Sequence, residues 1–201
     1  LAKGVGDVNG DGFDDFVIAG DDAELVFGGS VLTELEHLKT QKLGDDFDEF
    51  VSGDFNGDGY TDLATYKFGG DLEVHYGSRD GLSSGEAISP NKAGDYFIKL
   101  LVGDFDADGY DDLVYVGEPD PNTTDGIKTR DRYLNTFDGG TDGLGTAELT
   151  TIEGKSIDVA EADIGVGDPD KDGRSEILVQ SFKFKDYDLA FYETGSPVFD
   201  V

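Results

Sequence analysis

Short runs of apolar residues alternate with acidic, glycine-rich segments along the whole chain. One apolar run leads into each acidic segment, as at residues 97–102, and another follows it, as at residues 113–116. A third run comes after a polar turn, as at residues 133–137, and a weaker fourth run precedes the next acidic segment. Short apolar runs of this kind, bounded by turn residues, are typical of β-strands. The pattern therefore predicts four short strands in each repeating unit.

Four acidic segments align without gaps and define the repeat. They span residues 6–16, 53–63, 103–113 and 167–177, and their first aspartates are 47, 50 and 64 residues apart. A four-stranded antiparallel unit of this size cannot bury both faces alone, so the units must stack, and radial stacking gives a propeller. The predicted fold is all-β: a β-propeller of four-stranded antiparallel blades, which either closes as a small four-bladed ring or belongs to a larger propeller. Residues 1–201 form one repeat domain, with blades at approximately 1–45, 46–94, 95–155 and 156–201.

Two segments depart from the simple repeat. Residues 32–43 have partly helical spacing, but they contain Thr33 and His37, and we expect a loop followed by a strand. Residues 118–126 are rich in proline and aspartate and fall between the second and third strands of the third unit. We expect this insertion to form a projecting loop, which also carries a glycosylation sequon at Asn122.

Each acidic segment reads D-x-[ND]-x-D-G-x-x-[DE], a pattern of oxygen ligands for one hard cation. Side-chain oxygens at the first, third, fifth and ninth positions, with the backbone carbonyl of the seventh, can surround Ca²⁺, and glycine at the sixth permits the tight turn. Mg²⁺ is less suitable because it requires a regular octahedron. The four predicted sites consist of Asp7, Asn9, Asp11, Phe13 (carbonyl) and Asp15; Asp54, Asn56, Asp58, Tyr60 (carbonyl) and Asp62; Asp104, Asp106, Asp108, Tyr110 (carbonyl) and Asp112; and Asp168, Asp170, Asp172, Arg174 (carbonyl) and Glu176.

Solvated hairpins and EF-hand loops share parts of this pattern. A single acidic, glycine-rich turn is compatible with an ordinary solvated hairpin, but three or four carboxylates at short range repel one another unless a cation is bound. EF-hand loops share the first half of the pattern, but they end with a carboxylate at the twelfth position. Here the twelfth positions are Ile18, Thr65, Tyr115 and Val179, which lie in β-rich runs. Four loops in phase therefore favour four calcium sites.

Composition and charge indicate which kinds of molecule the chain can bind. The chain has 45 acidic and 15 basic residues, a net charge of -30 and no cysteine. Such a surface repels phosphate, so nucleic acids and anionic membranes are poor partners and we expect none, while cations are favoured. The absence of cysteine excludes thiolate metal sites and cysteine-based catalysis. No stretch approaches the ~20 apolar residues of a membrane span, so we expect no membrane insertion.

The second unit carries a family resemblance. Residues 53–63, GDFNGDGYTDL, followed by VHYGS at 74–78 and Gly81-Leu82, resemble the FG-GAP repeats of integrin alpha subunits and the similar VCBS repeats of surface proteins. The resemblance extends over essentially the whole chain, and the fourth unit departs most from it, with Pro169, Arg174 and Glu176. It implies that the acidic loop joins the first two strands of a propeller blade and holds Ca²⁺.

Three functions are compatible with these observations. The first is an extracellular or cell-surface calcium-binding module for adhesion or for protein or glycan interaction through blade-edge loops, in which calcium provides rigidity. Weak calcium sites, with dissociation constants of about 10⁻⁴ to 10⁻³ M, are typical of extracellular modules. The second is a polysaccharide-active enzyme, since some polysaccharide lyases resemble such propellers. The third is a structural block of a surface layer or appendage.

An enzyme is the least favoured of the three. The only histidines are His37 and His75, and no pair of acidic residues outside the loops has a spacing that suggests acid–base catalysis. His75 lies in an alternating strand, where a half-buried structural histidine is the more common case. Phe55 and Phe105 are best explained as core residues between blades. We therefore predict a chain that is not an enzyme and has no catalytic residues.

Overall fold

The computed structural model describes residues 2–20, 22–30, 38–44, 46–68, 72–90, 96–118, 132–152, 163–183, 186–192 and 199–200. Within these ranges the chain forms sixteen β-strands and no helix. The predicted all-β fold class is therefore confirmed. Most of the insertion expected at residues 118–126, including Asn122, lies outside the described residues, as does His37.

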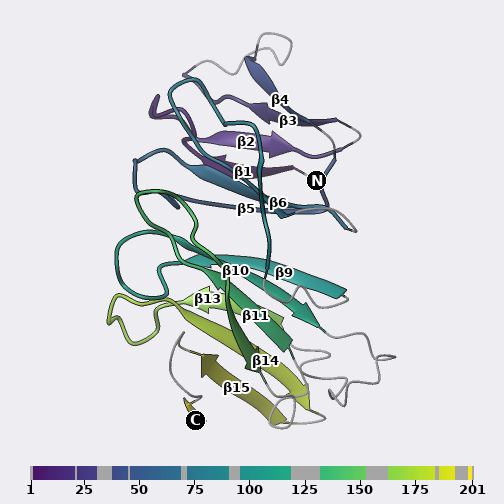
Figure 1. The fold of residues 1–201 in the computed structure, drawn as a ribbon, viewed down its shortest axis with the longest axis vertical. Helices are drawn as coiled ribbons and strands as arrows, with labels where there is room; N and C mark the ends of the chain where they lie inside the picture. The colour runs from purple at the N-terminus through teal and green to yellow at the C-terminus, as the bar shows by residue number, and fades with distance from the viewer. Residues whose placement is uncertain are drawn as a thin grey trace. The chain divides into compact units, whose positions relative to one another are not determined.

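The strands form four antiparallel sheets of four strands, each in sequence order (Figure 1). The first two sheets are β1 (Ala2–Gly6), β2 (Asp15–Ile18), β3 (Ala23–Val26) and β4 (Thr40–Gly44), and β5 (Glu49–Gly53), β6 (Asp62–Tyr66), β7 (Leu72–His75) and β8 (Glu86–Ile88). The other two are β9 (Tyr96–Gly103), β10 (Asp112–Glu118), β11 (Arg132–Phe137) and β12 (Glu148–Ile152), and β13 (Asp163–Gly167), β14 (Glu176–Lys183), β15 (Asp186–Tyr192) and β16 (Phe199–Asp200). Each sheet is thus a simple up-and-down meander, and the acidic loops connect its first two strands.

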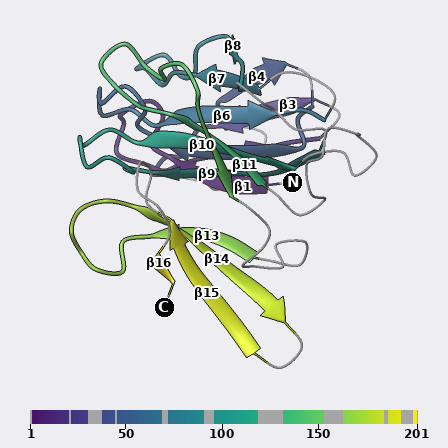
Figure 2. The same ribbon diagram turned by 60° about the horizontal axis from the view of Figure 1, so that its bottom comes forward.

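The chain divides into two compact units, Leu1–Ser89 and Pro90–Val201, each with two sheets. In the first unit β1 lies beside β5, and in the second β9 lies beside β13. The first strands of the two sheets therefore approach each other, as the inner strands of adjacent propeller blades do. In the second unit, β14 and β15 form a long antiparallel pair that is clear in Figure 2. Closure into a ring, and the number of blades in the native protein, stay predictions.

An apolar core fills the space between the two sheets of the first unit. Alternate residues of the first sheet, such as Val17 and Leu25, are fully buried. They cluster with Phe50 and Leu63 from the second sheet. The alternation arises because successive side chains of a strand point to opposite faces, so only one set faces the neighbouring sheet.

The second unit has an equivalent core. Leu101, Val114 and Leu134 of its first sheet cluster with Ile164 and Ile177 of its second sheet. Phe105, in the acidic loop that follows β9, belongs to the same cluster and is 1% exposed. The residue at the same position of the second loop, Phe55, is 0% exposed. Both phenylalanines are therefore buried, as expected of core residues.

The turn after β7 approaches the second acidic loop so closely that only glycine fits at residue 77. A Cβ atom on Gly77 would lie 2.5 Å from the Thr61 carbonyl oxygen and 3.0 Å from the Val8 carbonyl oxygen. Both atoms belong to the backbone and cannot rotate away. Gly77 therefore allows the chain after β7 to pass close to the acidic loop of the same blade.

Replacing Gly77 with alanine should lower the free energy of unfolding by about 1–3 kcal/mol, the usual cost of forcing atoms into a packed site. Gly29 is the matched control, because a Cβ there would meet no atom within 4 Å. Gly29→Ala should leave stability unchanged within about 0.5 kcal/mol or raise it slightly. Denaturant unfolding of the two variants measures both effects. Equal stability of the two variants would contradict the close packing at Gly77.

Candidate metal centre

In the acidic loops, backbone amides donate hydrogen bonds to side-chain oxygens of the same loop. In the first loop the Asp11 amide donates to Asp7 Oδ1 at 3.1 Å and to Asn9 Oδ1 at 2.9 Å. The Gly12 amide donates to Asp7 Oδ2 at 2.7 Å, and the Phe13 amide to Asp11 Oδ1 at 3.0 Å. These bonds turn the side-chain oxygens of the first, third and fifth positions toward the centre of the loop.

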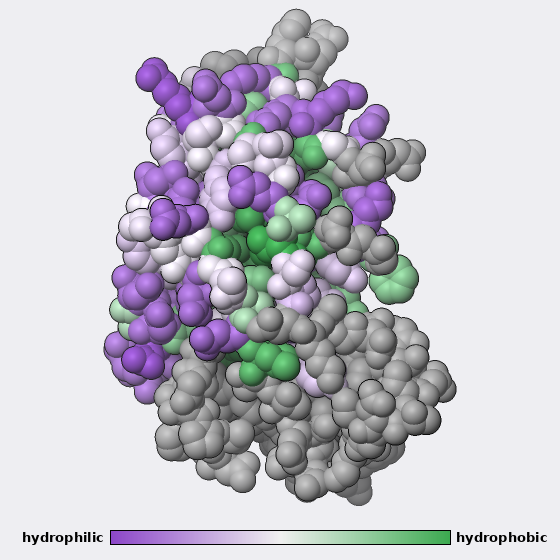
Figure 3. All heavy atoms as spheres, in the orientation of Figure 1, coloured by the Kyte–Doolittle hydropathy of each residue, from purple (hydrophilic) through white to green (hydrophobic). Residues whose placement is uncertain are grey.

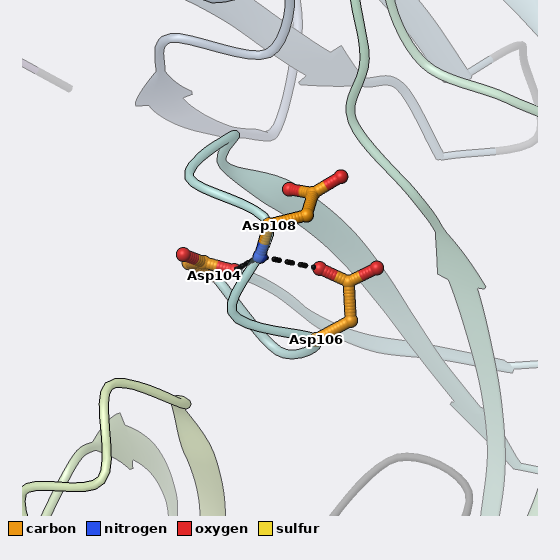
Figure 4. Close-up of side chains that lie close together, drawn as sticks. All are labelled: Asp104, Asp106 and Asp108. Atoms are coloured by element: carbon orange, nitrogen blue, oxygen red, sulfur yellow. Dashed lines mark hydrogen bonds between the residues drawn. The ribbon is translucent and has the colours of Figure 1, made fainter.

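The second and third loops repeat this arrangement bond for bond. In the third loop Asp104 and Asp106 flank the Asp108 amide nitrogen, which donates to them at 3.1 and 3.0 Å (Figure 4). One carboxylate oxygen from each of Asp104, Asp106 and Asp108 lies within 4.8 Å of the others. Among the described residues, no basic side chain forms an ion pair with these three carboxylates. Within the described part of the chain, only backbone amides offset their mutual repulsion.

The backbone of each loop has a positive φ at two positions, the fourth and the sixth. The sixth position is always glycine, with φ between 85° and 97°, in agreement with the turn expected there. The fourth position was missed in the sequence analysis: Gly10 and Gly57 have φ near 70°, and Ala107 and Lys171 have φ of 63° and 62°. A left-handed conformation costs a non-glycine residue about 1–2 kcal/mol. The loops keep the same geometry even where the sequence does not favour it.

The ninth-position carboxylates have a structural role in addition to the one predicted. Asp62 is fully buried and accepts two backbone hydrogen bonds, from Phe55 at 2.9 Å and from Gly77 at 2.7 Å. Asp15 accepts the same pair of bonds from Val8 and Gly28, at 3.0 and 2.7 Å, and Asp112 from Phe105 and Gly139, at 2.8 and 2.7 Å. Each of these carboxylates thus joins the start of its loop to the turn after the third strand.

Burial changes the acidity of these carboxylates. In the metal-free protein burial raises the pKa of Asp62 from its ordinary 3.8 to about 7, although the hydrogen bonds from Gly77 and Phe55 lower it. Burial likewise raises the pKa of Asp112 to about 6, and that of Asp15 is also raised. Charges of other aspartates in the same loops add to each rise. A cation in the loop would favour the ionised carboxylate and oppose this effect.

The fourth loop holds its ninth-position residue differently. Pro169 stands at the second position and has no N–H, so it cannot donate the bond that Val8, Phe55 and Phe105 make. Glu176, one methylene longer than aspartate, is 3% exposed, and a carboxylate oxygen lies within 4.8 Å of oxygens of Asp168 and Asp170. In the fourth loop, the loss of an amide donor at Pro169 is therefore accompanied by a longer carboxylate side chain at Glu176.

Asp138 contributes further negative charge beside the third loop, and the sequence analysis did not identify it. It lies in the turn after β11, and its pKa is raised by burial and by the charges of Glu148, Asp106 and Asp108. Asp138 in turn raises the pKa of Asp112. It occupies no position of the repeat motif, so only the folded arrangement places it there.

Adjacent loops of one unit are joined by backbone hydrogen bonds. The eighth residue of one loop donates to the carbonyl of the first aspartate of the preceding loop: Thr61 to Asp7 at 3.0 Å, and Ser175 to Asp104 at 2.6 Å. A second bond, from the Ser78 amide to the Val8 carbonyl at 3.1 Å, adds to this link in the first unit. The ligand positions of one blade are therefore fixed partly by the next blade.

The donor set fits a hard cation of the size of calcium. The first, third and fifth positions offer only carboxylate and amide oxygens, held on one side of each loop by backbone amides. The seventh-position residues Phe13, Tyr60, Tyr110 and Arg174 each donate their amide to the fifth aspartate, so they follow the same turn. Calcium accepts six to eight oxygen ligands in irregular geometry, which this arrangement can supply.

Four meander sheets with an acidic loop between the first two strands define the class: an all-β repeat protein of the β-propeller type. Residues 54–115 match the family model of FG-GAP-like repeats. The match runs from Asp54, at the first position of the second loop, to Tyr115 in β10, and it confirms the resemblance over this segment. The comparison with curated proteins found no match.

The surroundings of the loops are strongly hydrophilic. In the first unit, shown in the upper part of Figure 3, purple hydrophilic side chains cover the left margin, where the loops lie in Figure 1. None of the described segments is a helix long and apolar enough to cross a membrane.

The raised pKa values predict how stability depends on pH in the absence of calcium. Between about pH 4 and 7 folded Asp62 keeps a proton that the unfolded chain has released, so the free energy of unfolding falls as pH rises through this window. Asp62→Asn should reduce the slope of melting temperature against pH from pH 5 to 8 in excess chelator. Asp46→Asn removes an exposed carboxylate and controls for net charge. An identical slope in wild type and Asp62→Asn would contradict the prediction.

Proposed function

We propose that this chain is an extracellular calcium-binding module of the FG-GAP type, in which calcium makes the propeller rigid and blade-edge loops bind a protein or glycan partner. The observation that carries the proposal is the repeated loop geometry. In all four loops the sixth-position amide donates to Oδ2 of the first aspartate, and no basic side chain pairs with the Asp104, Asp106 and Asp108 cluster among the described residues. An arrangement that concentrates negative charge four times over needs a cation to offset it.

Calcium would be held by the twenty ligand residues predicted from the four loops. When bound, it would supply positive charge at the centre of each loop. The first, third and fifth residues would then hold the loop closed. The ninth-position carboxylate would connect the loop to the blade, because its oxygens also accept the backbone bonds described above. Calcium would thereby stabilise the meander. We place the module outside the cell or on its surface, where calcium is abundant enough to fill weak sites of the kind that extracellular modules have.

We also propose that the module has no catalytic activity. His75 is 3% exposed, its Nδ1 lies 3.1 Å from the Ser83 carbonyl oxygen, and its Nε2 lies 3.5 Å from Thr65 Oγ1. A buried ring with these protein partners is suited to a structural role in the strand and is poorly placed to meet a polysaccharide. This favours an interaction module over a lyase-like enzyme.

Removing calcium should lower stability markedly. Each site that binds only the folded protein adds RT ln(1 + [Ca²⁺]/Kd), about 2 kcal/mol at a concentration about 30-fold above Kd. We expect the melting temperature to fall by several degrees or more in excess chelator and to recover when calcium is restored. High salt should partly replace calcium by screening the carboxylates. A melting curve unchanged by chelator would show that the loops are ordinary turns.

The number of carboxylates should set the relative affinity of the loops, since charge count tunes calcium affinity. The third position is aspartate in the third loop but asparagine in the second, and both side chains accept the same amide bond at 3.0 Å. Asp106→Asn should therefore weaken one site by about three- to tenfold, and Asn56→Asp should strengthen one by a similar factor. Calorimetric titration measures both changes.

Because each substitution in this pair introduces a residue that another loop already has at that position, both variants should fold. Asp142→Asn, on an exposed turn, is the control for net charge and should leave all sites unchanged. If Asp106→Asn and Asp142→Asn lower calcium affinity equally, the net charge of the protein accounts for the change. Asp106 is then not a ligand.

A further inference from the structure

An open hollow lies beside the first acidic loop, within the first unit. Its lining consists of Asn9, Gly10 and Asp11 from the first loop, Tyr60 from the second loop, and Arg79 from the turn after β7. Its volume is about 520 Å³, within the range of small-molecule sites. Of the predicted calcium ligands of the first loop, Asn9 and Asp11 line the hollow and Asp7 and Asp15 do not, so the hollow adjoins the predicted calcium site and shares two of its residues.

The walls of the hollow are fixed by short contacts. The Tyr60 ring packs on Gly10, where a Cβ atom would lie 2.7 Å from the ring carbon Cε1. The turn that carries Arg79 is closed by two bonds between Ser78 and Gly81, both at 2.8 Å, and the Ser78 amide is bonded to the first loop. The Arg79 backbone and the Tyr60 ring are thus held in place before any ligand arrives, which limits the entropy lost on binding.

The hollow is rich in hydrogen-bond donors, although the protein as a whole is rich in acceptors. Within the described residues, the Arg79 guanidinium and the Tyr60 hydroxyl form no hydrogen bond or ion pair. Asn9 accepts the Asp11 amide through Oδ1, and no described residue accepts a bond from its Nδ2. In the second loop the equivalent Asn56 Nδ2 donates to Asp58 Oδ2 at 3.0 Å. Asn9 therefore keeps a donor available that its counterpart uses inside the loop.

We propose that this hollow binds a uronate, the carboxylate-bearing sugar of an acidic glycan. A guanidinium matches a carboxylate with two parallel hydrogen bonds. The Asn9 amide and the Tyr60 hydroxyl can donate to ring and hydroxyl oxygens of the same sugar, while the Tyr60 ring forms a wall beside it. The proposal deepens the proposed function and rests on it, because calcium in the first loop would offset the charge of Asp11, the one acidic residue among the described residues of the lining.

The lining favours a sugar acid over an acidic peptide. Among the described lining residues, only the Tyr60 ring offers an apolar surface to anchor a peptide, and none lies on a strand that could pair with a peptide backbone. A net charge of -30 repels any polyanion at long range, so the contact must be local. Added salt should therefore strengthen binding or leave it unchanged, because it screens the repulsion more than the close contact.

The test compares methyl β-D-glucuronide with methyl β-D-glucoside, which carries a hydroxymethyl group in place of the carboxylate, by NMR titration of the full chain in millimolar calcium. We expect the glucuronide to bind with Kd of about 1 mM and the glucoside at least tenfold more weakly. Arg79→Gln should lose at least tenfold in glucuronide affinity. Lys42→Gln, on exposed β4, makes the same change in charge and should lose none. Tyr60→Phe should lose several-fold, and phenylalanine already occupies the seventh position in the first loop.

Each variant is also titrated with calcium alone, so the two proposals can fail separately. Normal calcium binding without glucuronide binding overturns the uronate site and leaves the proposed function standing. Glucuronide binding that depends on Arg79 in a protein that binds no calcium supports the hollow and overturns the calcium module. Equal binding of glucuronide and glucoside, or Arg79-dependent binding of hexaglutamate in place of glucuronide, overturns the assignment to a uronate.

Discussion

A buried carboxylate at the ninth position of the loop is the interaction on which each of the first three blades depends. Asp62 begins β6, accepts the Phe55 amide at the start of its loop, and accepts the Gly77 amide after β7. Three segments of one blade thus meet at a single side chain. Hydrogen bonds to an ionised group are among the strongest in a protein, but burying the charge is costly. The residue that organises the blade is therefore also the one whose charge most needs a cation nearby.

The same region explains why glycine precedes the first aspartate in the first and third repeats. A Cβ atom at Gly103 would lie 2.7 Å from Ser175 Oγ, and one at Gly6 would lie 2.8 Å from Thr61 Oγ1. The eighth residue of the following loop occupies this space and donates its amide to the first aspartate. Neighbouring blades are consequently linked through the loop itself as well as through the apolar core. A cation that orders one loop would also fix an acceptor used by its neighbour.

Much of the fold could be predicted from the sequence because its signals are local. Strand alternation, turn residues and the spacing of the acidic positions lie within about ten residues of one another, and they specified four meander sheets with a loop after each first strand. The ninth-position bonds to Gly28, Gly77 and Gly139 were missed because they join the loop to a turn beyond the third strand. The positive φ at Ala107 and Lys171 was also missed, since neither residue type favours it. Asp138 and the hollow at Arg79 depend on tertiary contacts that no local pattern records.

The four repeats differ at positions that decide which groups of each loop donate hydrogen bonds and which oxygens accept them. In the fourth loop Pro169 removes one amide donor, and the longer Glu176 lies near Asp168 and Asp170. In the second loop Asn56 closes on Asp58, whereas Asn9 at the same position of the first loop keeps its amide free of described partners beside Arg79. The shared geometry is maintained by backbone amides, which every residue but proline supplies, so side chains can vary around it. A repeat built in this way can keep a common cation site in every blade while a single blade edge acquires the donors needed to recognise a ligand.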